Sequence, residues 1–96
     1  IVSNLVQVMG KLGELVRFHR KKAGLTQIQL ANLAGVGKST VYDIEKGKAT
    51  VQIDSLFAVL TAMNISIQFS GPLNAAFERW YATQTSDQRR TVSNRR

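Results

Sequence analysis

Residues 25–47 read LTQIQLANLAGVGKSTVYDIEKG and contain two short helical patterns with a glycine between them. Thr26 carries the hydroxyl that a helix N-cap needs, and the apolar spacing after it predicts a helix over residues 27–34. Gly35 follows the last apolar position and supplies the positive φ with which helices commonly end. A second helix is predicted over residues 38–46. The stretch therefore predicts two helices joined by a turn of about three residues.

The second of these helices has one apolar and one polar face. Val41 and Ile44 are three positions apart and face inward. The opposite face carries Lys38, Ser39, Tyr42, Asp43 and Lys46. This arrangement is typical of a recognition helix that lies in the major groove of DNA. Lys38 can donate to guanine, Ser39 can contact either base of a pair, and Asp43 can accept from cytosine N4.

The stretch resembles the Cro/repressor (XRE) family of helix-turn-helix domains, and the resemblance covers roughly residues 11–69. It rests on the Thr26-Gln27 opening, the small Ala31, the turn glycine Gly35 and the closing Ile44-Glu45-x-Gly47. The resemblance implies that Gln27 binds a DNA phosphate and that Glu45 pairs with Arg20 on the preceding helix. It also implies that residues 48–50 pass close to the DNA backbone. One departure is Gly37, where the family more often has Ser or Thr.

These residues divide into two groups of expected DNA contacts. Lys38, Ser39 and Asp43 are expected to read bases, and Tyr42 is a further candidate on the same face. Gln27, Thr40, Lys46 and Lys48 are expected to set the register on the phosphates.

The expected fold is all-α: a small lambda-repressor-like helical domain with one short C-terminal β-strand for dimerisation.

Length and charge fit this hypothesis. The chain has 96 residues, 44% of them hydrophobic, which is enough for one small domain with a modest core. It has no cysteine, which excludes disulfides and thiolate metal sites. No apolar run approaches the roughly 18 residues of a membrane span, so a cytoplasmic, nucleoid-associated protein is expected. The net charge is +7, and eight basic against three acidic residues lie between Lys11 and Lys48, as a phosphate-binding surface requires.

Helices are also predicted on both sides of the central stretch. Residues 1–9 fit either a helix that begins near Ser3 or a short strand. A helix is predicted over residues 11–23 and another over residues 53–63. Their core candidates, with those of residues 27–34, are Leu12, Leu15, Val16, Phe18, Ile28, Leu30, Ala31, Leu33, Ala34, Leu56, Phe57, Val59, Leu60 and Met63. Glu14, Arg17, Lys21 and Lys22 are expected to meet solvent or phosphate.

Residues 65–70 alternate between apolar and polar side chains, which predicts a strand. Ile65, Ile67 and Phe69 are its apolar positions. A strand needs a hydrogen-bonded neighbour, so we expect it to pair with the same strand of a second copy. The resulting homodimer would bind a palindromic operator in double-stranded DNA. This architecture resembles the HipB-type antitoxins, which implies autoregulation of an operon and a kinase toxin as partner; a stand-alone repressor is the alternative.

Gly71-Pro72 separates residues 1–70, the expected DNA-binding domain, from residues 71–96. A short amphipathic helix is predicted over residues 73–82, with Phe77, Trp80 and Tyr81 at helical spacing. These aromatic side chains either pack on their own domain or its dimer mate, or anchor a partner protein. Residues 83–96 are polar and include Arg89, Arg90, Arg95 and Arg96, and we expect them to be largely disordered.

Catalysis is not expected, because the sequence shows no paired carboxylates, no nucleophile with a base and no cluster of metal ligands. Residues 35–40 resemble the end of a phosphate-binding loop, but its first glycine would have to replace Asn32. His19 is the only histidine and is interpreted as structural or exposed. No cofactor or metal is expected. A protein-binding adaptor that acts through the C-terminal aromatic helix remains an alternative to the DNA-binding protein.

Overall fold

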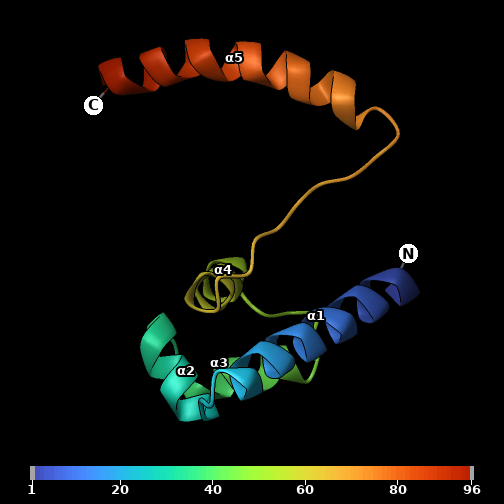
Figure 1. Ribbon diagram of the computed structural model, residues 1–96, viewed down its shortest axis with the longest axis vertical. Coiled ribbons are helices and arrows are strands. Elements are labelled where there is room, and N and C mark those ends of the chain that lie inside the picture. The colour runs from blue at the N-terminus through green and yellow to red at the C-terminus, as the bar shows by residue number, and fades with distance from the viewer. Residues whose placement is uncertain (1, 96) are drawn as a thin grey trace. The chain divides into compact units, whose positions relative to one another are not determined.

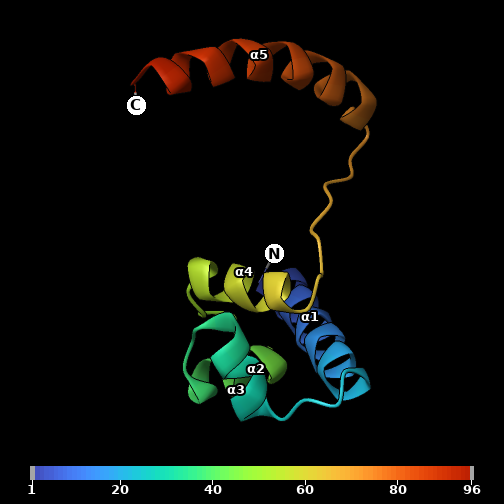
Figure 2. The same cartoon turned by 60° about the vertical axis from the view of Figure 1, so that its left-hand side comes forward.

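The computed structural model describes the backbone of residues 2–95 and the side chains of residues 4–84. Within these residues the chain forms α1 (Val2–Lys22), α2 (Gln27–Ala34), α3 (Lys38–Glu45), α4 (Ile53–Ala62) and α5 (Asn74–Arg95). The chain divides into two compact units, Ile1–Ser66 and Ile67–Arg96, where the sequence placed the boundary after residue 70. In the first unit, α3 packs against α1, α2 and α4 (Figures 1 and 2). The predicted helical architecture is confirmed.

The core of the first unit receives side chains from all four of its helices. The largest fully buried side chains are Val16, Leu30, Val41, Ile44 and Val59. Val41 and Ile44 lie on the face of α3 that was predicted to point inward. Burial of side chains of this size is worth about 1.5–3 kcal/mol each. The core therefore holds α3 by one face.

The ends of α2 form as the residue types predict. The hydroxyl of Thr26 accepts from the backbone N–H of Gln29 at 3.1 Å, and the side chain of Gln29 accepts from the N–H of Thr26 at 2.8 Å, which completes a capping box. Gly35 ends the helix at φ 74°, and the N–H of Val36 returns to the carbonyl of Ala31 at 3.0 Å. The bounds of α2 agree with the prediction, and α3 ends one residue earlier than predicted.

Gly13 lies where α1 meets the C-terminal end of α3. A Cβ atom at Gly13 would be 2.4 Å from the carbonyl oxygen of Ile44 and 2.8 Å from that of Glu45. Only a residue without a side chain permits this approach of two backbones. Gly47, two residues after α3 ends, has φ 80°. It lies beside Gly10, whose Cα would be 3.0 Å from a Cβ at Gly47.

Several core predictions were wrong. Leu15, Phe18, Ile28, Leu33 and Phe57 are exposed, Phe18 to 60% of its surface. Each lies on an apolar stripe of its helix, but the neighbouring helices cover only part of that stripe. Periodicity identifies the apolar face of a helix without showing how much of the face a small domain can cover. α1 also runs without interruption from Val2, which resolves the ambiguity at the N-terminus in favour of a helix.

The predicted strand at residues 65–70 is absent from the part of the chain that the structure describes, residues 2–95. The N–H of Ile65 donates to the carbonyl of Leu60 at 2.9 Å as α4 ends, and within those residues the backbone of residues 66–70 forms no hydrogen bond. Ile67 and Phe69 are exposed, Phe69 to 78%. The physical reason is that a strand is defined by pairing, and the single chain offers residues 66–70 no neighbouring strand.

The second unit contains α5, which extends beyond the short helix predicted over residues 73–82. Helix continues to Arg95, whereas a largely disordered tail was expected from residue 83. No glycine or proline follows Pro72 to stop a helix. The basic residues Arg89, Arg90, Arg95 and Arg96 lie outside the residues whose side chains are described. None of the described helices is long and apolar enough to cross a membrane.

Candidate nucleic-acid interface

The face of α3 that points away from the core is polar and basic. Lys38, Ser39, Tyr42 and Lys46 are exposed, whereas Thr40 and Asp43 are partly buried. The Nζ atom of Lys46 lies 5.5 Å from the centre of the Tyr42 ring, within the range of a cation–π contact. These side chains project from a helix whose other face is fixed in the core, so they can enter a groove without disturbing the fold.

Asp43 and Lys48 lie next to each other at the C-terminal part of α3. Their Oδ2 and Nζ atoms are 3.5 Å apart, and the backbone N–H of Lys48 donates to the carbonyl of Asp43 at 3.0 Å. The ion pair offsets the negative charge of Asp43 on a surface that is expected to meet phosphate. A hollow of about 190 Å³ adjoins this pair and is lined by Thr40, Asp43, Lys48, Thr50, Val51, Gln52 and Ser55. The structure thus groups Thr40, Asp43 and Lys48.

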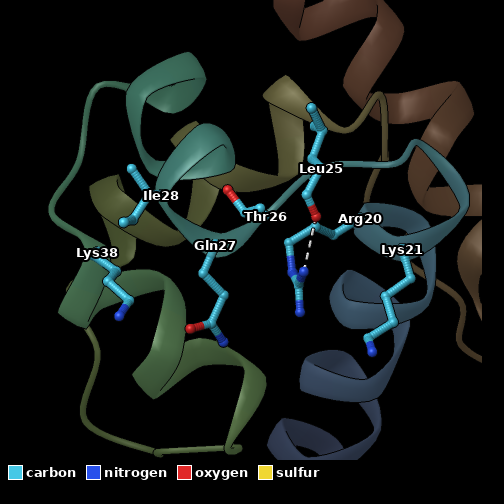
Figure 3. A pocket seen from close by; sticks show the side chains of 7 residues that line it. All are labelled: Arg20, Lys21, Leu25, Thr26, Gln27, Ile28 and Lys38. Carbon is cyan, nitrogen blue, oxygen red and sulfur yellow. Dashed lines mark hydrogen bonds between the residues drawn. The ribbon is translucent and has the colours of Figure 1, made fainter.

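Arg20 and Glu45 form the ion pair that the resemblance implies. Arg20 Nε donates to Glu45 Oε2 at 2.6 Å, and Nη2 donates to Oε1 at 2.9 Å. Only 10% of the Arg20 side chain and 3% of the Glu45 side chain are exposed. Two parallel bonds between planar groups make this a strong, geometrically specific contact. A third bond from Nη1 of Arg20 to the carbonyl of Leu25, 2.9 Å long, ties the segment before α2 to the same guanidinium (Figure 3).

The pKa values of the pair reflect these contacts. Burial raises the pKa of Glu45, but the hydrogen bonds from Arg20 and Gln27 and the positive charges of Arg20 and Arg17 lower it, and the net change is downward. The hydrogen bond to Glu45 raises the pKa of Arg20 against the opposing effect of burial. Both groups are therefore charged near neutral pH.

Gln27, the first residue of α2, lies between two hollows of about 470 Å³ each. The first is lined by Arg20, Lys21, Leu25, Thr26, Gln27, Ile28 and Lys38 (Figure 3). The second is lined by Glu14, Arg17, Arg20, Lys21, Gln27, Tyr42, Glu45 and Lys46. The cations that line the two hollows come from α1, from α3 and from Lys46 directly after α3, and this concentration of positive charge suits an anionic ligand. The sequence indicated Arg17 and Lys21 only as solvent or phosphate groups, because helical spacing alone did not show that they face α3.

Metal ligands do not gather anywhere among the described side chains: no three His, Cys, Asp or Glu residues lie together as an ion would require. His19 directs its Nδ1 atom to the carbonyl of Leu15, 2.8 Å away on the same helix. The polar groups that converge in the first unit are cations, amides and hydroxyls, together with the carboxylates of Glu45 and Asp43, which are paired with Arg20 and Lys48.

Residues 16–70, more than half of the chain, match the family model described as Helix-turn-helix. This chain belongs to the helix-turn-helix family. It is 39% identical over 67 residues to an uncharacterized HTH-type transcriptional regulator of Sinorhizobium fredii, with 70% of this chain and 88% of the relative covered. It is 50% identical over 34 residues to an uncharacterized HTH-type transcriptional regulator of Methanothermobacter thermautotrophicus, with 35% of this chain and 49% of the relative covered.

The helix-turn-helix match ends at residue 70, so α5 lies beyond it. Phe77, Trp80 and Tyr81 form a cluster on this helix. The Phe77 ring stacks on Tyr81 with centroids 5.4 Å apart and lies 5.9 Å from Trp80. Each of the three side chains is exposed, Trp80 to 56%. In this helix-turn-helix protein the aromatic cluster is thus an addition to the unit that carries α3.

Proposed function

We propose that this helix-turn-helix protein is a DNA-binding transcription regulator that inserts α3 into the major groove. The proposal depends mainly on one observation. Val41 and Ile44 anchor α3 in the core, while Lys38, Ser39 and Lys46 are exposed on its other side. Both relatives reported above are named as HTH-type transcriptional regulators, which supports the same role. The proposal assigns no catalysis to the chain.

The proposed DNA contacts fall into two groups, contacts to bases and contacts to phosphates. Lys38 at the N-terminus of α3 donates to guanine, Ser39 contacts either base of a pair, and Asp43 accepts from cytosine. Each good base contact contributes about 1–3 kcal/mol of discrimination against a wrong base. Gln27, Thr40, Lys46 and Lys48 bind phosphates, and Tyr42 lies on the same face. Phosphate contacts fix the register and carry no sequence information.

The affinity for DNA of any sequence comes from the basic residues that surround α3. Arg17 and Lys21 on α1 line a hollow with Lys46, the residue directly after α3, and Lys38 lines the other hollow. Neutralisation of phosphates by such cations releases counterions, so affinity falls as salt rises. We expect a logarithmic salt slope of roughly −0.9 for each phosphate that is neutralised.

We further propose that the protein acts as a homodimeric repressor whose two copies pair through residues 65–70. The supporting observations are the backbone of residues 66–70, which forms no hydrogen bond within residues 2–95, and the exposed Ile67 and Phe69. An apolar segment with free backbone groups can add to another strand. A two-fold dimer would place two copies of α3 about 34 Å apart on a palindromic operator. Sedimentation velocity tests this step, because replacing both Ile67 and Phe69 with Ser would yield a monomer.

More specifically, we propose that the protein is a cytoplasmic antitoxin of a HipBA-like operon. In this role the protein represses its own operon and binds a kinase toxin. The exposed aromatic cluster on α5 supports a protein partner, because aromatic side chains dominate binding hot spots. The same observation supports the alternative of an adaptor that acts through α5 alone. A chain truncated after Pro72 separates the two: the regulator still binds DNA, whereas the adaptor loses its function.

Fluorescence anisotropy tests the DNA-binding proposal. We would compare the DNA upstream of the chain's own gene with a scrambled duplex of equal length at about 0.15 M salt, where weak surface electrostatics are screened. A preference of at least roughly a thousandfold is expected, whereas equal weak binding would contradict the proposal. Lys38→Ala should weaken binding to the upstream DNA by about 1–3 kcal/mol and reduce the preference. Lys48→Ala should weaken binding to both duplexes alike.

A further inference from the structure

Glu45 accepts hydrogen bonds from two elements at once. Its Oε1 atom accepts from Nη2 of Arg20 at 2.9 Å and from Nε2 of Gln27 at 3.1 Å, while Oε2 accepts from Arg20 Nε at 2.6 Å. Its side chain is 3% exposed. One buried carboxylate at the end of α3 therefore joins the C-terminal part of α1 to the first residue of α2.

The carboxylate fixes which way the Gln27 amide faces. A charged carboxylate only accepts hydrogen bonds, and an amide has a donating nitrogen and an accepting oxygen. Rotation of the amide by half a turn would place its oxygen against the negative charge of Glu45. Figure 3 shows the result: the Gln27 nitrogen lies on the side of Arg20 and the oxygen on the side of Lys38.

One donor of the Gln27 amide remains unused. The nitrogen carries two protons, and Glu45 accepts one of them. Among the residues that the structure describes, the second proton has no protein acceptor. Gln27 also lines both basic hollows, where Lys21, Lys38 and Lys46 would draw a phosphate toward the amide. A donor of fixed direction in a basic hollow suits a phosphate oxygen.

We propose that Glu45 is a positioning residue for DNA: it holds the Gln27 amide so that the second N–H donates to a phosphate oxygen of the DNA backbone. The inference rests on the proposed DNA-binding function and deepens it. Glu45 itself touches no DNA. Its buried charge thus serves both the fold, through Arg20, and the placement of a phosphate contact, through Gln27.

A double-mutant cycle tests this coupling. The probes are a duplex of about 20 base pairs, roughly two helical turns, from the DNA upstream of the gene, and its scrambled counterpart. Gln27→Ala should weaken binding to both duplexes about tenfold, the loss of one hydrogen bond to a charged group. Glu45→Gln should weaken binding about tenfold in the wild-type background and less than about twofold in the Gln27→Ala background, because the group that it positions is already absent.

Lys48→Ala serves as the matched control, because Lys48 contacts Asp43 and not Glu45. The loss of binding free energy caused by Lys48→Ala should add to the loss caused by Glu45→Gln. If Glu45→Gln weakens binding equally with and without Gln27, Glu45 acts only through the fold and the inference is wrong. If the wild-type protein binds neither duplex, the proposed function and the inference both fail.

A measurement without DNA covers the case in which Glu45→Gln does not fold. In the NMR spectrum of the wild-type protein, the two side-chain amide protons of Gln27 should differ in chemical shift, because only one of them is hydrogen-bonded to the Glu45 carboxylate. Gln68, which is exposed, provides the reference pair. Gln27 resonances with the same positions and the same solvent exchange as those of Gln68 would overturn the inference even if DNA binding itself is intact.

Discussion

Replacement of Gly13 by Ala tests whether the close approach of α1 and α3 maintains the fold. The added Cβ would be 2.4 Å from the Ile44 carbonyl oxygen and 2.8 Å from that of Glu45, where ordinary contacts begin at about 3.4 Å. Both oxygen atoms belong to the backbone, so rotation of a side chain cannot relieve the clash. The two helices would have to separate by about 1 Å at this point.

The magnitude follows from two opposing contributions. Overpacking of this kind costs about 1–3 kcal/mol, and the removal of a glycine from the helix interior returns about 0.5–1 kcal/mol. We expect Gly13→Ala to lower the free energy of unfolding by about 0–2.5 kcal/mol, the difference between the two ranges, with about 1 kcal/mol as the central value. For a domain of this size a loss of about 1 kcal/mol corresponds to a fall in Tm of about 4–8 °C.

Gly10→Ala is the matched control, one turn earlier on the same helix. A Cβ at Gly10 would meet nothing within 4 Å, so only the gain in helix propensity remains, and Tm should rise by about 2–8 °C. Thermal unfolding followed by far-ultraviolet circular dichroism measures both variants. Because the two substitutions are chemically identical, opposite signs are the expected outcome. A Gly13→Ala protein as stable as Gly10→Ala would refute the reasoning from the close approach.

Three further predictions concern stability. Thr26→Ala should lower the free energy of unfolding by about 1 kcal/mol in urea titrations, since the capping hydroxyl is lost, and Thr26→Ser should retain it. Glu45→Ala should cost about 3–5 kcal/mol because it leaves Arg20 buried without its partner, and an Arg20→Met/Glu45→Leu double variant should lose much less. Folding lowers the pKa of Glu45, so the ionised carboxylate contributes its full stabilisation at pH values above the ordinary pKa of a Glu side chain. That contribution is lost as the pH falls through the lowered pKa of the folded state. Tm measured from neutral pH down to about pH 3 should therefore depend less on pH in Glu45→Gln than in the wild type.

The central unit was predictable from sequence because its ends depend on local chemistry. Thr26, Gly35 and Gly47 specify a cap, a left-handed turn and a stop through interactions with residues close in sequence. Those signals placed α2 at residues 27–34, and the spacing of Val41 and Ile44 separated the buried from the exposed face of α3. The ion pair of Arg20 and Glu45 came from the resemblance, since nothing in residue spacing brings together side chains that are 25 positions apart.

The failures concern features that depend on neighbours distant in sequence. Phe18 and Phe57 lie on apolar stripes, yet they are exposed because no helix of the first unit covers them. Residues 65–70 alternate like a strand, but alternation provides no partner for the backbone. α5 differs from expectation in the opposite direction: a polar composition suggested disorder after residue 82, whereas the helix runs to Arg95 through a segment without glycine or proline. The hydrogen bond between Gln27 and Glu45 had no signal in the sequence at all.

The position of α3 is set by its contact with α1 as much as by the turn that precedes it. Glu45 contributes its carbonyl to the close approach at Gly13 and its carboxylate to Arg20 and Gln27. A separation of the two backbones at Gly13 would therefore displace the carboxylate that holds the Gln27 amide. Loss of the cap at Thr26 would weaken α2 without moving Glu45. It follows that Gly13→Ala should reduce DNA affinity even well below its Tm, whereas Thr26→Ala should reduce stability and leave the affinity of the folded protein nearly unchanged.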